Sequence, residues 1–262
     1  MKRRSKETLD FHIDIPKDLQ TIMRIFANHK KDCFLVGGAV RDALMGKEPK
    51  DFDIATNALP DKVIEMMRKY PKFKISTVGK AFGVIIIRSP SGEDFECATY
   101  RKDIGEGRRP DSVEFTTLEN DVLRRDLTIN ALVYDPFSQT IIDYVGGIAD
   151  VENGIVRAVG DPAQRFREDK LRILRAVRFA ARLGSDLDPG TAKAIMLDND
   201  LSGVSPERIR DEFAKAVKSA KHGGHLLELI HGLDLWPQIF PGLEVKSSGW
   251  SKKFDVQVAL LL

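Results

Sequence analysis

Residues 34–42 read Phe-Leu-Val-Gly-Gly-Ala-Val-Arg-Asp, and residues 50–56, shortly after them, read Lys-Asp-Phe-Asp-Ile-Ala-Thr. The apolar run from Cys33 to Val36 predicts a buried strand, and the stretch from Ala39 to Met45 predicts a short helix. The glycine pair between them permits a turn in which the backbone approaches a ligand without hindrance from a Cβ atom. Backbone N–H groups at the start of a helix suit a phosphate, and Arg41 follows one turn later.

The second stretch places two acids one residue apart in a segment that reads as a strand. Residues two apart on a strand point to the same face, so Asp51 and Asp53 are expected to project together while Phe52 and Ile54 pack beneath. Two such carboxylates repel each other unless a cation lies between them, and Mg²⁺ is commonly held by one or two carboxylates plus substrate phosphates. Taken singly, a glycine pair is more often an ordinary turn and an Asp-x-Asp a solvated strand end. Together they predict a site for a nucleoside triphosphate and Mg²⁺.

Length and composition narrow the classes of protein to which the chain can belong. The chain has 262 residues, which suits one large or two modest domains, and its net charge of +2 is too small to indicate a partner. No apolar run is long enough to cross a bilayer, and residues 1–6 lack the apolar core of a signal peptide. Cys33 and Cys97 both fall in apolar segments, as buried thiols of a reducing compartment do. We therefore expect a cytoplasmic enzyme with no membrane partner, and the sequence does not indicate its oligomeric state.

The order of patterns along the chain indicates two parts. Residues 1–14 read as a basic, weakly ordered lead-in, and helical and strand periodicities then alternate up to residue 101. Residues 102–109 read as a loop. From residue 164 onward only helices are predicted, the longest running from Ala163 to Leu183. The pattern predicts an α+β fold, with a mixed-sheet domain over residues 1–155 and an all-helical domain over residues 156–262.

The longest predicted helix is strongly basic. Between residues 161 and 182 there are seven Arg or Lys residues and three acids, and four arginines fall within an arc of about 120°, namely Arg172, Arg175, Arg178 and Arg182. The plainer interpretation is a solvated face in which Asp169 and Arg172, at i,i+3 spacing, form an ion pair worth about 0.3–0.5 kcal/mol. Alternatively, the carboxylate of Asp169, as a hydrogen-bond acceptor, and the guanidinium of Arg172, as a donor, read the hydrogen-bonding edge of a nucleobase.

Three longer motifs extend this picture. They are Gly-Gly-Ala-Val-Arg-Asp with Asp-Phe-Asp in residues 37–53, Arg-Arg-Asp-Leu-Thr-Ile-Asn in 124–130, and Arg-Phe-Arg-Glu-Asp-Lys-Leu-Arg-Ile-Leu-Arg-Ala-Val-Arg-Phe in 165–179. With Ser-Pro-Glu-Arg-Ile at 205–209, the chain resembles the class II tRNA nucleotidyltransferase and bacterial poly(A) polymerase family. The resemblance implies a polymerase-β-like nucleotidyltransferase head followed by a helical neck.

The resemblance also implies roles for individual residues. Asp51 and Asp53 match the metal ligands and catalytic carboxylates of the family. Its nucleotide-binding positions are matched by Gly38 and Arg41 at the triphosphate, by Arg125, by the base-reading pair Asp169 and Arg172, and by Arg175 and Arg178. Glu168 matches an acid that positions Arg172. The implied reaction is Mg²⁺-dependent addition of C and A to the 3′ end of tRNA from CTP and ATP, with release of pyrophosphate.

Several alternatives stay open. Members that add the full C-C-A end carry further helical body and tail domains, whereas this sequence stops at Leu262, so a truncated or compact member is expected. The loop before residues 108–110 looks slightly short, which allows a CC-adding enzyme; an A-adding enzyme and a poly(A) polymerase are further alternatives. An RNA-binding module that has lost catalysis is the non-enzymatic alternative. A third carboxylate ligand, from Glu96 or Asp94, is a lesser possibility.

Overall fold

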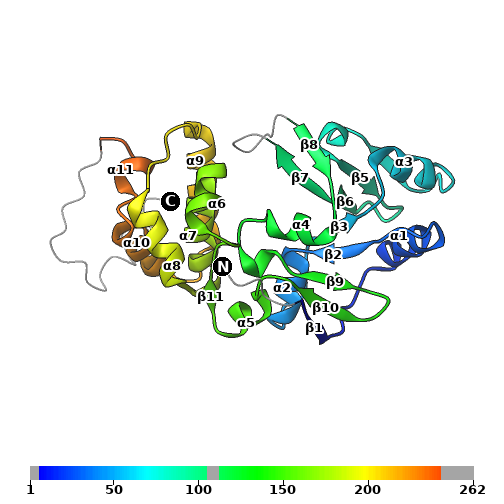
Figure 1. Cartoon of the computed structure of the whole chain (residues 1–262), viewed down its shortest axis with the longest axis horizontal. Helices are drawn as coiled ribbons and strands as arrows, with labels where there is room; N and C mark the ends of the chain where they lie inside the picture. Colours follow the sequence, from blue (N-terminus) through cyan, green and yellow to red (C-terminus); the bar gives the residue numbers. More distant parts are fainter. Residues whose placement is uncertain (1–5, 105–111, 243–262) are drawn as a thin grey trace. The chain divides into compact units, whose positions relative to one another are not determined.

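The computed structural model describes residues 6–104 and 112–242, which divide after Val151 into two compact units. The first unit is built on a mixed eight-stranded sheet and the second mainly on helices (Figure 1). This confirms the predicted α+β fold of a sheet-based head followed by a helical region. No described helix is long and apolar enough to traverse a lipid bilayer.

The large sheet has the strand order β1-β10-β9-β2-β3-β6-β5-β4. Its strands are β1 (Glu7–Asp10), β2 (Phe34–Val36), β3 (Asp53–Thr56), β4 (Lys74–Ser76), β5 (Val84–Arg88), β6 (Asp94–Thr99), β9 (Val133–Asp135) and β10 (Thr140–Asp143). Only β3 and β6 pair in parallel among these strands. A parallel pair needs a crossover connection, which α3 (Pro60–Arg68) and the hairpin β4–β5 supply.

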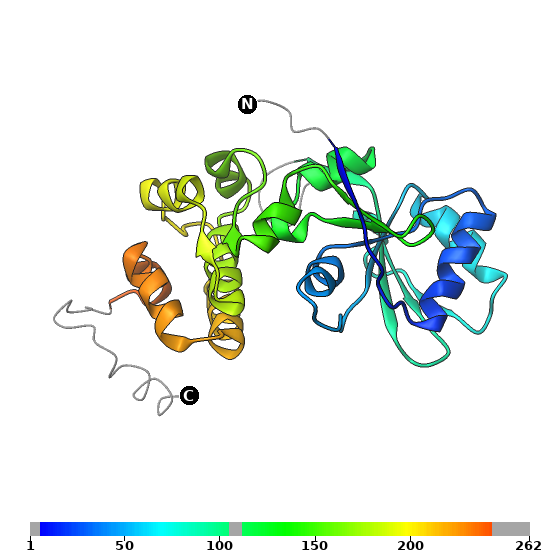
Figure 2. The ribbon, with the colours of Figure 1, turned by 90° about the horizontal axis from the view of Figure 1, so that it is seen from below.

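One row of side chains crosses the sheet and forms the centre of the core. In register from β10 to β5, its members are Ile141, Tyr134, Leu35, Ile54, Cys97 and Ile85. All are buried in one cluster with side chains of α1 (Lys17–Asn28) and α3. Figure 2 shows both helices on the same side of the sheet. Since side chains alternate along a strand, the neighbouring row, which includes Asp53, faces away from this core.

The remaining elements of the first unit frame the sheet. They are the hairpin β7 (Arg101–Ile104) and β8 (Ser112–Phe115), the helices α2 (Gly38–Leu44), α4 (Leu118–Leu123) and α5 (Gly147–Glu152), and the 3-10 turns η1 (Lys80–Phe82) and η2 (Thr128–Asn130).

Two sequence predictions fail in this unit. Residues 7–10 form an edge strand paired with β10 rather than part of a weakly ordered lead-in, and residues 102–104 belong to β7 rather than to a loop. The rest of that loop, residues 105–109, lies outside the described residues.

The second unit consists of packed helices with one short parallel ladder. Its elements are β11 (Ile155–Val156), α6 (Pro162–Glu168), α7 (Leu171–Leu183), β12 (Asp186–Leu187), α8 (Pro189–Leu197), α9 (Pro206–Ser219), α10 (Gly223–Gly232) and α11 (Trp236–Ile239). The prediction of one helix from Ala163 to Leu183 is wrong. Asp169 has extended backbone angles, φ −153° and ψ 105°, which separate α6 from α7. The apolar spacing runs on through the break, so periodicity alone does not reveal it.

Candidate active site

The paired carboxylates lie where β3 begins. Asp53 is the first residue of β3, and Asp51 precedes it by two positions. The register that joins Ile54 to Cys97 brings Asp53 level with Glu96 of β6. Both therefore project from the face of the sheet opposite the α1 and α3 core.

The electrostatics of Asp53 favour a cation beside its carboxylate. Although Asp53 is exposed to solvent, desolvation by the surrounding protein, together with the negative charges of Glu96 and Asp51, raises its pKa to about 6, and Arg125 opposes that shift. A carboxylate held between like charges is stabilised by a cation, and the oxygen donors suit a hard divalent ion. Among the described residues no three His, Cys, Asp or Glu side chains come together as a metal cluster. The oxygen donors that Asp51 and Asp53 offer, with Glu96 level with Asp53 on the neighbouring strand, are of the kind that such an ion accepts.

The glycine turn is rigidly built. Gly37 adopts φ 73° and ψ −123° ahead of α2, a conformation that residues with a Cβ rarely adopt. Arg41 is only 2% exposed. Its Nε and Nη2 donate to Asp42 Oδ1 at 2.9 and 2.7 Å, and its Nη1 donates to Asn130 Oδ1 of η2. Arg41 thus ties the turn to η2 from within the protein.

Arg125 is held beside the turn and the carboxylates. A Cβ on Gly37 would lie 3.4 Å from Arg125 Nη1, and Arg125 Nη2 donates to Asp121 Oδ2 at 3.2 Å. Its buried Nε has no hydrogen-bond partner among the residues that the structure describes. Asp121, 2% exposed, also binds Arg124 at 2.7 Å and accepts from the backbone N–H of Arg101 at 3.2 Å. Asp121 therefore fixes the Arg-Arg-Asp motif.

In the second unit, the Asp169 and Arg172 side chains bind different partners. Asp169 accepts from Arg208 Nη2 of α9 at 3.1 Å and from the backbone N–H of Leu171 at 3.2 Å. Arg172 Nη1 donates to Glu168 Oε2 at 2.7 Å and to the carbonyl oxygen of Arg165 at 3.1 Å. The intrahelical ion pair of the plainer interpretation is therefore not formed, and each side chain is oriented separately.

The other two predicted arginines of α7 lie around one aromatic ring. Arg178 Nε donates to the buried carboxylate of Glu212, on α9, at 2.5 Å, and its guanidinium lies 4.4 Å from the ring centroid of Phe179. The guanidinium of Arg175 lies 5.7 Å from the same centroid. Arg178 thus has a counter-ion on another helix.

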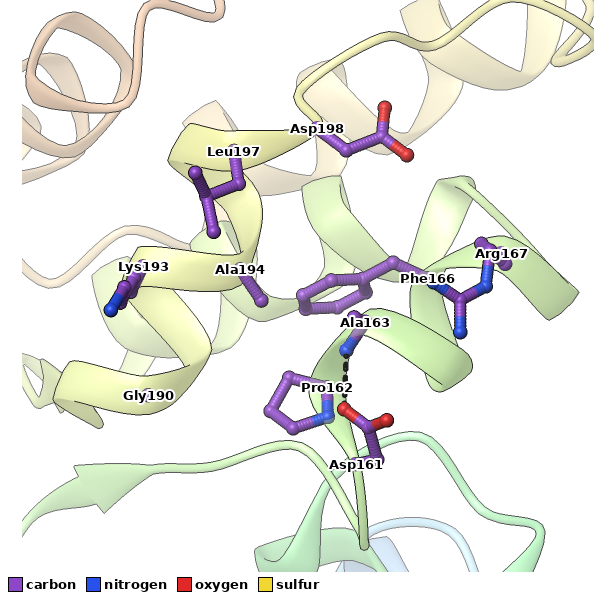
Figure 3. Close-up of a pocket in the computed structure, with 10 residues that line it drawn as sticks. All are labelled: Asp161, Pro162, Ala163, Phe166, Arg167, Gly190, Lys193, Ala194, Leu197 and Asp198. Carbon is purple, nitrogen blue, oxygen red and sulfur yellow. Dashed lines mark hydrogen bonds between the residues drawn. The ribbon is translucent and has the colours of Figure 1, made fainter.

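A cavity of about 310 Å³ opens between α6 and α8 of the second unit. Figure 3 shows the ring of Phe166 on its floor, Lys193 and Arg167 on opposite sides, and Asp161 accepting from the backbone N–H of Ala163. None of the predicted site residues lines this cavity. It is therefore a feature separate from the carboxylates.

The first unit brings together Gly38, Arg41, Asp51, Asp53 and Arg125, and the second carries Asp169, Arg172, Arg175 and Arg178. Sequence reasoning missed three residues that hold these groups, namely Asp121, Arg208 and Glu212. Asp121 carried a signal, because it precedes Arg124 and Arg125 by three and four residues on a helix. For Arg208 no sequence pattern beyond the Ser-Pro-Glu-Arg-Ile motif indicates this role, since it lies 39 residues from Asp169.

Two family models match the chain. The poly A polymerase head domain matches residues 33–157, and the probable RNA and SrmB-binding site of polymerase A matches residues 186–246. The CCA-adding enzyme of Bacillus licheniformis is 41% identical over 229 residues, covering 86% of this chain and 55% of that protein. Poly(A) polymerase I of Escherichia coli O6:H1 is 36% identical over 244 residues, covering 87% and 50%.

A solved structure shows the same fold. The Bacillus stearothermophilus CCA-adding enzyme in complex with CTP superposes with a TM-score of 0.73 at 36% identity, covering 82% of this chain and 52% of that one. The chain spans about half the length of the curated relatives it matches. Together, the head, the helical region and these relatives show that the chain belongs to the family of class II tRNA nucleotidyltransferases and bacterial poly(A) polymerases.

Proposed function

We propose that this chain is a CCA-adding tRNA nucleotidyltransferase, which transfers nucleoside monophosphates from CTP and ATP to the 3′ end of tRNA and releases pyrophosphate. The observation that carries the proposal is that Asp53 lies level with Glu96 on the neighbouring strand, with Asp51 two residues before it, in a chain 41% identical to a CCA-adding enzyme. Their mutual repulsion contributes to a pKa of about 6 for Asp53. Such perturbed carboxylates are typical of functional sites. These substrates, and two buried free thiols, favour the cytoplasm as the place of action.

In this proposal Asp51 and Asp53 hold Mg²⁺. When bound, the ion supplies activation of the RNA 3′-hydroxyl and stabilisation of the leaving pyrophosphate. Arg125 offers donors to the triphosphate oxygens from beside Asp53, where charge develops during transfer. Gly38 leaves its backbone open to the phosphates. Arg41, bound to Asp42 and Asn130, keeps the turn in the shape that receives them.

Selection of the nucleotide is assigned to α7 and its neighbours. Asp169 presents acceptors and Arg172 presents a donor fork, the two functions needed to recognise the edge of C or A. Arg208 and Glu168 orient them, because a recognition pair discriminates only when its side chains are held in place. Arg175 and Arg178 complete the nucleotide contacts.

Polyadenylation is the second candidate. The similarity to poly(A) polymerase I and the match to the poly A polymerase head domain favour it. The two reactions share the carboxylates and differ in the acceptor RNA and in the number of nucleotides added. The same assay therefore separates them.

The test extends a tRNA that lacks its 3′-terminal C-C-A, with Mg²⁺ and CTP, ATP or both, and products sized to one nucleotide. CCA addition predicts three added nucleotides when both triphosphates are present. A stop after two C residues would indicate a CC-adding enzyme, addition of one A to a tRNA ending in C-C an A-adding enzyme, and a long A ladder a poly(A) polymerase. Absence of any product would contradict the proposed activity.

The base-reading assignment has its own variant. Arg172→Ala is expected to reduce the preference for CTP and ATP over UTP and GTP, because it removes a donor rather than a metal ligand. The control is Arg210→Ala, whose side chain on α9 is largely exposed and pairs only loosely with Asp211 at 3.7 Å. Unchanged discrimination in Arg172→Ala would contradict the assignment.

A further inference from the structure

A buried carboxylate that the proposed reaction does not use binds the 3-10 turn η2. Asp150, on α5, is 4% exposed, and its Oδ2 accepts a hydrogen bond of 2.7 Å from the hydroxyl group of Thr128, the first residue of η2. Thr128 is itself buried. Burying a carboxylate is costly unless it is hydrogen-bonded, so losing this contact should have consequences for whatever η2 holds.

η2 holds two arginines beside the glycine turn. The side-chain oxygen of Asn130, the last residue of η2, accepts from Arg41 Nη1, and its carbonyl oxygen accepts from Arg125 Nη1 at 3.4 Å. The glycine turn is also tied to the segment after η2, because the N–H of Gly37 donates to the carbonyl oxygen of Leu132 at 3.0 Å. A displacement of η2 would therefore move both guanidinium groups relative to the turn.

η2 depends on α5 for its place. It is a single turn closed by backbone hydrogen bonds of 3-10 type, whose geometry is poorer than that of an α-helix. The backbone of Gly147 lies so close to η2 that a Cβ added there would be 2.3 Å from the carbonyl oxygen of Thr128. The carboxylate of Asp150 binds the hydroxyl group of the same threonine. α5 thus holds η2 by a backbone contact and by a side-chain hydrogen bond.

α5 is in turn anchored to the large sheet. Asp143, the last residue of β10, is 1% exposed. Its carboxylate accepts from the backbone N–H groups of Val145, Gly146 and Ile148 at 2.8–2.9 Å. A continuous series of contacts therefore runs from the sheet through α5 and η2 to the arginines, and such supporting contacts keep a functional side chain in place.

We propose that Asp150 is a positioning residue for nucleotide transfer, which places η2 through the hydroxyl group of Thr128. Through η2 it places the guanidinium groups of Arg41 and Arg125. The proposal rests on the proposed function, because it takes a nucleoside triphosphate as the ligand beside the glycine turn. Asp150 acts at one remove from that ligand, by keeping the donors of Arg125 where charge develops during transfer.

The test removes one hydroxyl group. Thr128→Val deletes the donor to Asp150, whereas Thr128→Ser retains it. With rates normalised to the amount of folded protein, Thr128→Val should raise KM for CTP by about tenfold or more while leaving KM for RNA unchanged, because a small misplacement of a substrate-binding group has effects of this size. Thr128→Ser should retain the parental values.

A double-mutant cycle identifies the contact through which Asp150 acts. Asp150→Ala should raise KM for CTP as Thr128→Val does. The double variant should lose no more than either single variant, because both substitutions remove the same hydrogen bond. Effects on KM for CTP that add in full would overturn the proposal.

Thr191→Val is the matched control. The hydroxyl group of Thr191, buried in the second unit, also donates to a carboxylate, that of Asp188, at 3.2 Å. This variant should lower the Tm as Thr128→Val does and leave KM for CTP unchanged. The comparison therefore separates a loss of stability from a loss of positioning.

Calorimetric titration with CTP and Mg²⁺ provides a measurement that needs no turnover. Thr128→Val should bind CTP more weakly than the parent and than Thr191→Val. Equal affinity and KM for CTP in the parent and Thr128→Val would overturn the proposal, as would an equal loss in the control. If the parent binds CTP and Thr128→Val weakens that binding but neither extends RNA, the proposed activity fails while the positioning role stands. A parent protein that bound no CTP would overturn both.

Discussion

Asp53 occupies a position where its charge is unfavourable unless a cation is present. Desolvation by the surrounding protein and the negative charges of Glu96 and Asp51 act on this solvent-exposed carboxyl group, and Arg125 compensates only in part, so the pKa rises to about 6. In the folded, metal-free protein this group binds more protons between pH 4 and 6 than it does in the unfolded chain. Stability from this group is therefore lost as pH rises through that window.

Replacing Asp53 with Asn should remove this pH dependence. At neutral pH the metal-free variant should be more stable than the parent by about 1 kcal/mol, less than the roughly 3 kcal/mol of an unscreened shift of this size, since water screens an open carboxyl group. Urea unfolding at pH 4, 5, 6 and 7 measures this difference in the free energy of unfolding. If the free energy of unfolding of parent and variant changed in parallel with pH, Asp53 would not destabilise the metal-free protein in this way.

Asp121 has the opposite role. Arg125 and Arg124 outweigh the effect of burial and lower the pKa of this carboxyl group. Asp121→Asn should destabilise the protein by about 2–4 kcal/mol, because it leaves two half-buried arginines without their charge partner. The parent should lose this stabilisation as pH falls below about 4, and the variant should not.

Urea unfolding checks this prediction, with Glu65→Gln as control, since the Lys62–Glu65 pair is exposed and such pairs contribute about 0–1 kcal/mol. Equal losses in both variants would contradict the assigned role of Asp121. At the residue scale, the sequence predicted the carboxylates, the arginines and Glu168 as the partner of Arg172, but not the partners of Arg125 and Arg178. Arg178 with Glu212 and Asp169 with Arg208 are pairs that only tertiary folding brings together.

At the element scale, close backbone packing fixes how α5 meets η2. A Cβ on Gly147 would lie 2.3 Å from the carbonyl oxygen of Thr128 and 3.0 Å from a methyl group of Leu132. The carbonyl group of Thr128 belongs to the backbone and cannot move aside as a flexible side chain can. The position therefore requires glycine for steric reasons.

Gly147→Ala should destabilise the protein by about 2–4 kcal/mol through this overlap. Gly232→Ala is the matched control, because the space around that helical glycine is open and alanine should stabilise the helix by up to about 1 kcal/mol. Thermal unfolding compares the two. A Tm for Gly147→Ala at or above that of the parent would show that α5 shifts freely.

The elements themselves follow the sequence where periodicity is strong. The residues of α2 were predicted closely because apolar spacing and the flanking residues agree, and the prediction of helices from residue 164 onward holds apart from the short strand β12. Strand β1 was missed because an edge strand needs a partner, here β10, which lies far along the chain. The break at Asp169 was missed because its carboxylate satisfies Arg208 and the start of α7, a tertiary arrangement invisible to helical spacing.

At the scale of the whole molecule, a sheet-based unit provides the carboxylates and a helical unit provides the arginines proposed to select the nucleotide. Net charge gave no indication of RNA, whereas the three motifs did. The chain spans about half the length of these relatives. Activity of the chain as it stands therefore tests whether these two units suffice for nucleotidyl transfer.

The most direct measurement of the central claim is incorporation of labelled CMP from CTP into tRNA lacking its 3′ end, as Mg²⁺ is titrated. The comparison sets the parent against Asp53→Asn and Asp94→Asn, since Asp94 lies on β6 but pairs with Arg88 at 2.6 Å. We predict Mg²⁺-dependent incorporation by the parent and Asp94→Asn, and at least a thousandfold loss, on the order of 4 kcal/mol, in Asp53→Asn. Incorporation by Asp53→Asn at the parental rate and with the same Mg²⁺ dependence would contradict the account.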